Sequence, residues 1–211
     1  MLNIKYSDKS FESPYASIVE NAHNDAAKLL ENLSSDLTIE FVDNGASDQT
    51  GVGGFAASPH HLNVAIHKDF SDSTTQQRNL RAVVFHELFH INQCFTYEQS
   101  PFTALQAAVS EGCAVTFERE YGGGEASYAD FSEHSDEELT DWHDQLEQVG
   151  LQYFEDRDTW QRWAHYHPEL DQKWIIYKVG SWLVKRIIND NNLDVLDLQN
   201  KTPEEILLLK S

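Results

Sequence analysis

Cysteine, cationic residues and long apolar runs are scarce in this chain of 211 residues, and each scarcity excludes a class of protein. Two cysteines, Cys94 and Cys113, are too few for the disulfide framework of a small secreted protein. We interpret both as small buried residues. The chain also lacks an apolar run of the roughly 20 residues that span a bilayer, and its N-terminal residues lack the apolar core of a signal peptide. We therefore expect a cytoplasmic protein.

Positive charge is in short supply as well. The chain has 15 lysines and arginines against 35 aspartates and glutamates, which gives a formal net charge of −20. Nucleic acids and anionic membranes repel a surface of this sign, so we expect neither as a partner. The sequence leaves the oligomeric state open.

The most informative segment that is present is His86-Glu87-Leu88-Phe89-His90. It lies in an apolar stretch that predicts a buried helix, because Ala82 to Phe85 before it carry neither charge nor proline. Residues four apart on a helix share a face, so His86 and His90 are able to bind one metal ion. Glu87 lies one step round the helix, where it can accept a proton from a metal-activated water. The alternative is a buried helix whose two imidazoles are satisfied by hydrogen bonds.

A catalytic zinc site usually has three protein ligands and one open position. The sixth residue after His90 is Thr96, and Gln93 stands where the metzincin pattern requires glycine, so that pattern fails. Glu111 is the better candidate, since it is a single carboxylate in the middle of an apolar helical run, Thr103 to Phe117. The alternative for Glu111 is a buried ion pair with an arginine such as Arg78 or Arg81.

The HExxH helix followed by a helix with a glutamate resembles the gluzincin class of zinc metallopeptidases. Within that class, Ser110 to Ala114 and Tyr177 to Gly180 look like the bacterial family described as predicted Zn-dependent proteases. The resemblance implies a zincin-like fold, bound Zn2+ and the ligands His86, His90 and Glu111. One position departs from thermolysin-like enzymes, which have an aspartate four residues after the ligand glutamate. Here that residue is Val115, so the group that orients His86 is another carboxylate or a backbone carbonyl.

The order of predicted elements indicates an α+β fold that is mostly helical. We expect a single zincin-like domain over residues 1–211, in which a small antiparallel or mixed sheet precedes the metal-binding helices. Its three parts are a helix with the sheet (1–70), the metal-binding helices (76–121) and a helical C-terminal part (130–211). The predicted elements before and after the metal-binding helices are a helix from residue 13 to about 33, strands at 37–42 and 61–67, and helices at 130–147 and 170–189.

Gly53-Gly54-Phe55-Ala56 has two interpretations. In HExxH peptidases generally, the strand before the active helix borders the cleft, and an extended substrate pairs with it. This segment is therefore either such an edge strand, with unpaired backbone groups that bind a peptide, or a glycine-rich hairpin loop.

We expect a zinc-dependent peptidase that hydrolyses peptide bonds of a peptide or protein substrate through a metal-activated water. Glu87 would be the general base that accepts the proton of the attacking water and then the general acid that gives it to the departing amine. A second group usually helps to hold the oxyanion, and Tyr177 is the candidate, with His165 and His167 as competitors. The alternative for Tyr177 is a core ring whose hydroxyl bonds to the backbone.

Two other functions compete with the peptidase. One is a zinc-stabilised binding or regulatory protein without catalysis, and the other is an amidase that acts on a small molecule. Glu87 favours chemistry, because a purely structural metal site has no use for a carboxylate beside its ligands.

Overall fold

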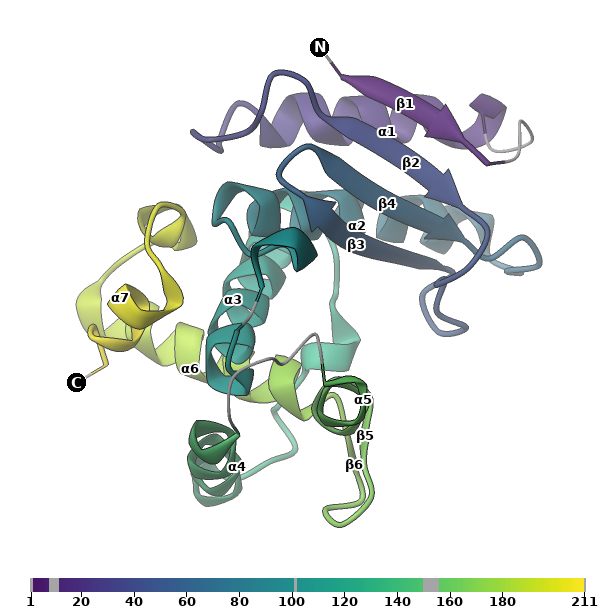
Figure 1. Ribbon diagram of the computed structural model, residues 1–211. Coiled ribbons are helices and arrows are strands. Elements are labelled where there is room, and N and C mark those ends of the chain that lie inside the picture. Colours follow the sequence, from purple (N-terminus) through teal and green to yellow (C-terminus); the bar gives the residue numbers. More distant parts are fainter. Residues whose placement is uncertain (1, 8–11, 101, 150–155, 211) are drawn as a thin grey trace. The chain divides into compact units, whose positions relative to one another are not determined.

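The computed structural model describes residues 2–7, 12–100, 102–149 and 156–210, with the backbone alone for residues 12–14. As predicted, the fold is α+β and mostly helical, with a small mixed sheet near the N-terminus (Figure 1). Within these ranges every helix is too short or too polar to cross a lipid bilayer.

The chain divides into two compact units, each formed by two segments. The first unit is Met1–Glu98 with Phe117–Glu125, and the second is Gln99–Thr116 with Ala126–Ser211. The organisation as one metallopeptidase domain with three parts stays a prediction.

The first unit is built on a sheet of four strands, covered on one face by helices α1 and α2 (Figure 1). The strand order is β1-β2-β4-β3, in which β1, β2 and β4 are parallel and β3 pairs antiparallel with β4. The elements of this unit are β1 (Asn3–Tyr6), α1 (Glu12–Ala26), β2 (Thr38–Val42), β3 (Val52–Ser58), β4 (His61–Ile66), α2 (Ser73–Asn92) and η3 (Glu118–Gly122).

Alternation of apolar and polar residues builds the core of this unit. Alternate residues of β2 and β4 are buried, among them Ile39, Phe41, Leu62 and Val64, because successive side chains of a strand point to opposite faces. Helix α2 is buried along most of its second half, which includes the whole HExxH segment. The predicted buried helix is therefore confirmed.

Two expectations for this unit differ from the structure. Helix α1 ends at Ala26 and not near residue 33, because Lys28 and Leu29 donate to carbonyls three residues back and tighten the chain into a turn. Cys94 is exposed, whereas Cys113 is buried as expected. Cys94 follows the end of α2 with φ of 59°, a left-handed conformation that breaks the helical path.

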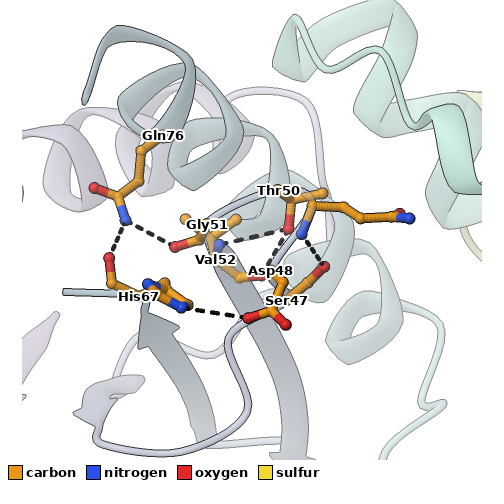
Figure 2. Close-up of polar contacts among 8 residues, drawn as sticks. Ser47, Asp48, Thr50, Gly51, Val52, His67 and Gln76 are labelled. Atoms are coloured by element: carbon orange, nitrogen blue, oxygen red, sulfur yellow. Dashed lines mark hydrogen bonds and ion pairs between the residues drawn. The ribbon is translucent and has the colours of Figure 1, made fainter. Parts of the chain in front are cut away.

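Helix α2 is fixed to the sheet at its N-terminal end by Gln76 (Figure 2). The buried Gln76 amide donates to the Gly51 carbonyl over 2.9 Å and to the His67 carbonyl over 2.7 Å. Asn79 donates to the Thr50 carbonyl over 2.9 Å. These bonds join the first turns of α2 to the start of β3 and the end of β4, and so fix where the HExxH segment lies along the sheet.

The second unit is predominantly helical and contains a short two-stranded ribbon. The predicted helices around Glu111 and at 130–147 and 170–189 are all present, with shifted ends. Its elements are η4 (Ser127–Ala129), α4 (Asp136–Gln148), α5 (Arg157–Ala164), β5 (Tyr166–His167), β6 (Gln172–Lys173), α6 (Ile175–Asn191), η5 (Val195–Leu198), α7 (Pro203–Leu207) and all but the last residue of α3 (Ala104–Phe117). The remaining short helix, η2 (Tyr97–Gln99), begins in the first unit.

Candidate metal centre

His86 and His90 lie side by side on α2 and are almost completely buried, with 5% and 4% of their surfaces exposed. Their Nε2 atoms are 3.0 Å apart, and their rings meet edge to face with centroids 4.7 Å apart. Both side chains belong to a group of residues able to hold a metal ion. The helical spacing of four residues thus brings together two ring nitrogens that could bind one metal ion.

The carboxylate of Glu118 fixes the hydrogen position on His86. His86 Nδ1 lies 3.1 Å from Glu118 Oε2, and both side chains are buried. An ionised carboxylate only accepts hydrogen bonds, so Nδ1 of His86 donates and carries the hydrogen. The Nε2 atom of the neutral ring then keeps its lone pair, which is the form that binds a metal.

Glu118 is positioned by the π-helix η3, which directly follows α3. Phe117, immediately before it, packs its ring against Phe85 and Phe89 of α2 with centroids 5.4 and 5.1 Å apart. After η3 the chain folds back over the carboxylate at Gly124, where a Cβ atom would lie 2.5 Å from Glu118 Oε1. The aromatic contacts and the absence of a side chain at Gly124 together hold Glu118 against His86.

The donor set of the two histidines suits zinc. Two nitrogens bound to one tetrahedral zinc at about 2.0–2.1 Å lie roughly 3.3 Å from each other. The Nε2 atoms of His86 and His90, at 3.0 Å, need to move apart by only a few tenths of an ångström. Neutral imidazole oriented by a carboxylate is a common zinc ligand.

Glu87 connects the HExxH helix to the edge strand β3. Its Oε2 atom accepts a hydrogen bond of 2.8 Å from the backbone amide of Ala56, and the side chain is 7% exposed. Gly54 permits this close approach, because a Cβ atom there would lie 2.5 Å from Glu87 Cγ and 2.7 Å from Val83 Cγ2. The carboxylate of Glu87, which directly follows His86 in the sequence, is thus held against strand β3.

The same strand and helix are matched in length between their two points of contact. From Gly51, the residue directly before β3, to Ala56 the chain advances about 16 Å at the roughly 3.3 Å per residue of a strand. From Gln76 to Glu87 the helix also advances about 16 Å at 1.5 Å per residue. Both end contacts are hydrogen bonds, so β3 and α2 are in register where Glu87 lies.

We expect Gly54→Ala to lower the free energy of unfolding by about 1–3 kcal/mol, the usual cost of forcing an extra methyl group into a packed contact. Urea denaturation of the variant measures this loss. In a Glu87→Ala background two of the three close contacts of the new methyl group are gone. The same substitution should then cost less, and an equal cost in both backgrounds would contradict the contact.

Glu111 lies on α3 in the second unit, and its side chain is buried. The next residue, Gly112, packs directly on the backbone of Gly180 of α6, since a Cβ atom there would lie 2.2 Å from the Gly180 carbonyl oxygen. The arginines that were the alternative partners of Glu111 bind other acids. Arg78 pairs with Glu125 at 2.9 Å, and Arg81 pairs with Asp25 at 3.0 Å.

Tyr177 is a half-buried residue of α6 in the second unit. Its ring packs edge to face on Tyr128 with centroids 5.1 Å apart, beside the buried residues Val115, Ala126 and Ala129.

The two histidines that compete with Tyr177 both contact tryptophan rings. His165 lies against Trp160, with centroids 4.4 Å apart, and His167 lies against Trp163 at 4.6 Å. Burial lowers the pKa of His167, so this imidazole is neutral near pH 7.

A second group with metal-binding side chains lies on α4 and comprises His143, Asp144 and Glu147. Its histidine is buried, but both carboxylates are exposed. The ammonium group of Lys210 lies 3.1 Å from His143 Nε2, where it competes with any metal ion for the ring nitrogen. The buried pair on α2 is the stronger candidate.

Glu118 is the residue that the sequence did not reveal. Because the residue four places after Glu111 is Val115, the sequence indicated only that another carboxylate or a backbone carbonyl orients His86. Seven residues after Glu111 a helix has turned almost two full turns, so Glu118 returns to nearly the same face. That spacing is the signal that would have found it.

Comparison with known proteins shows the family of this chain. The family model described as "Predicted Zn-dependent protease (DUF2268)" matches residues 15–208, which is most of the chain. No curated protein and no solved structure matches this sequence.

Proposed function

Since this chain belongs to the family of predicted Zn-dependent proteases, we propose that it is a peptidase whose zinc ion is held by His86, His90 and Glu111. One observation carries the proposal. Glu87, the neighbour of His86 in the sequence, is buried and bonded to the backbone of the edge strand β3. A metal that only stabilises the fold needs no carboxylate in that place, whereas hydrolysis does.

Helical spacing supports Glu111 as the third ligand. Glu118 bonds to His86, and Glu111 precedes it by seven residues on a helical segment without a break between α3 and η3. Seven residues bring the two carboxylates to nearly the same face, about 10 Å apart along the axis. A carboxylate from α3 with two imidazoles from α2 matches the ligand set of a catalytic zinc site.

Zinc, when bound, polarises the scissile carbonyl and makes a water molecule acidic enough to be deprotonated near neutral pH. Glu87 would accept a proton from the attacking water, because its carboxylate is the base of the motif that is not itself a proposed metal ligand. Glu87 then donates the proton to the nitrogen of the departing amine. The hydrogen bond from the Ala56 amide keeps the carboxylate in one orientation through both transfers.

Strand β3 supplies the surface that aligns a peptide. It is the outermost strand next to β4, and no described strand pairs with its other edge. The Ala56 amide donates to Glu87 and not to β4, so the backbone groups of Ala56 point to the free edge of β3. Successive residues of a strand alternate between its two edges, so those of Gly54 point to the free edge as well, and those of Gly53 and Phe55 point to β4. An extended peptide that pairs with this edge is bound through its backbone, beside the proton acceptor.

Tyr177 is the proposed second donor to the oxyanion. A tyrosine hydroxyl is neutral at pH 7 and donates one hydrogen bond, which suits an oxygen that gains charge in the transition state. Its ring is held by the contact with Tyr128, so the hydroxyl needs little reordering during reaction.

The proposal is tested by zinc analysis of the purified full-length protein, followed by digestion of a peptide library with and without a chelator. We expect about one zinc per chain and cleavage that the chelator stops and added zinc restores. Zinc without any cleavage of peptides or small amides would identify a zinc-stabilised binding protein instead. Cleavage of small amides alone would identify an amidase, and absence of zinc would overturn the site.

We expect Glu118→Ala to raise the dissociation constant for zinc by about 10–100-fold, the usual effect of losing the partner of a metal-binding histidine. Without the carboxylate, His86 is free to carry its hydrogen on Nε2, the ligand atom. Titration of the metal-free protein with zinc against a competing chelator measures the change. Glu120→Ala, an exposed residue of the same helix, is the matched control and should bind zinc as the unaltered protein does. Equal affinities in the two variants would contradict the role of Glu118.

A further inference from the structure

Two of the large apolar side chains exposed in the described part of the chain are in contact with each other. Phe55 of β3 is 40% exposed and Tyr97 of η2 is 50% exposed, and their ring centroids are 5.9 Å apart at an interplanar angle of 49°. The other two, Tyr166 and Leu208, lie in the second unit. A single exposed apolar residue needs no explanation, but two adjoining rings form a surface on which a third apolar group gains contact area.

This aromatic pair lies on the strand that holds Glu87. Phe55 is between Gly54, which packs on Glu87, and Ala56, whose amide bonds to Glu87. Side chains alternate along a strand, so Phe55 projects from the opposite face of the sheet to the one that Gly54 presents to α2. Phe55 is therefore the residue between the two contacts of β3 with Glu87, and its ring points away from α2.

A peptide paired with the edge of β3 has the same alternation. Every second side chain of such a peptide projects to the face on which Phe55 lies, and neighbouring side chains of paired strands are close enough to touch. The substrate residue opposite Phe55, one place from the residue opposite Ala56, thus has its side chain beside the Phe55 and Tyr97 rings.

The surroundings favour an apolar side chain over a charged one. The residue opposite Phe55 on β4 is Asn63, which is neutral, and the preceding residue of β3 on the same face is Gly53. A subsite for lysine or arginine would require a carboxylate at that place in addition to the rings.

We propose that Phe55 and Tyr97 form a subsite that selects peptides with an aromatic or large aliphatic residue near the scissile bond. This inference rests on the proposed peptidase function and names its substrate class. Phe55 and Tyr97 contact the substrate but take no part in proton transfer or metal binding.

The test uses a panel of fluorescently labelled alanine-based octapeptides that carry Phe, Leu, Ala, Lys or Asp at one position, with that position moved along the peptide. Cleavage by the full-length protein gives kcat/KM for each peptide. Binding to zinc-loaded Glu87→Gln protein, followed by fluorescence anisotropy, gives affinities without turnover. We expect Phe and Leu to exceed Ala and Lys by at least about tenfold at one position in both measurements.

The variants are Phe55→Ala, Tyr97→Ala and the two combined, with Tyr166→Ala as a matched exposed-tyrosine control in the second unit. The combined variant should lose the tenfold preference and retain cleavage of the alanine peptide, whereas the control should keep the wild-type profile. Phe55→Leu, which preserves an apolar surface on the strand, should keep most of the preference. Thermal unfolding shows that each variant is folded.

Failure of this inference is distinguishable from failure of the peptidase function. Cleavage without a preference for apolar residues, or a preference that survives in the combined variant, overturns the subsite and leaves the peptidase intact. Binding with a preference that the combined variant loses, but without cleavage, supports the subsite and overturns the peptidase. A protein that neither binds nor cleaves the panel overturns the subsite.

Discussion

Replacing Glu87 by glutamine is expected to lower kcat by about 10²–10⁴-fold, the usual contribution of a general base, and to leave the zinc content unchanged. Glutamine has nearly the same shape, and its Oε1 atom still accepts the hydrogen bond from the Ala56 amide that Glu87 accepts in the structure. It cannot take a proton from water. The variant therefore separates the loss of proton transfer from any rearrangement of strand β3.

Steady-state kinetics on a cleaved peptide and elemental analysis of the same preparation check both halves of this expectation. The donor of this hydrogen bond is the backbone amide of Ala56, so a substitution at Ala56 would not remove it. Glu87→Ala is the comparison that removes both the base and the acceptor, and it should be less stable than Glu87→Gln as well as inactive. A glutamine variant with full activity would refute the role of Glu87.

Replacing His86 by alanine is expected to reduce bound zinc to the background level and to remove all zinc-dependent cleavage. The substitution deletes one of the proposed ligands and also leaves the buried Glu118 carboxylate without the ring that it contacts at 3.1 Å. Loss of a hydrogen-bond partner from a buried group costs about 1–3 kcal/mol, so the variant should also unfold at a lower urea concentration.

The control for His86→Ala is His143→Ala, because His143 is also a buried histidine in a group of metal-binding side chains. Elemental analysis should find full zinc in the His143 variant and none in the His86 variant. The reverse result would move the metal to α4, and unchanged zinc in both would exclude either histidine as a necessary ligand.

Local patterns predicted the parts of the fold that depend on neighbouring residues. The HExxH helix was expected from its apolar flank and is buried as α2. The strand at 61–67 is present as β4 (His61–Ile66). For the glycine-rich segment at 53–56 the sequence left an edge strand and a hairpin loop open, and the structure has strand β3 (Val52–Ser58) there. The helical repeat of α2 and the alternation of side chains in β4 are patterns within a few residues, so the sequence alone shows them.

Features that depend on distant parts of the chain were not predicted. Strand β1 (Asn3–Tyr6) pairs in parallel with β2, and the register of that pair reflects no pattern within four residues. The helix expected from residue 170 begins at Ile175, because the residues before it form the second strand of the β5–β6 ribbon. This ribbon was not predicted, since strands of two residues are too short to show a repeat in the sequence.

The candidate site also contains both residues that local spacing predicts and contacts that depend on distant parts of the chain. The spacing of His86 and His90 was visible because four residues make about one turn. The contact of Glu118 with His86 arises where α3 changes to a π-helix, and the bond of Glu87 to Ala56 joins residues 31 apart. The spacing of seven residues from Glu111 places Glu118 on a face of the helix, but the contact partners of Glu118 and of Glu87 depend on how two elements pack.

Insertion of one residue into β3 between Gly51 and Ala56 would do more than lengthen a loop. The two hydrogen bonds at these ends tie the strand to Gln76 and Glu87, whose separation along α2 is fixed by the helix. An added residue would exchange the two faces of the strand and turn a bulky side chain such as that of Phe55 toward the carboxylate. The two hydrogen bonds thus set the number of residues between Gly51 and Ala56, and an insertion there should disturb the site more than one in the loops outside it.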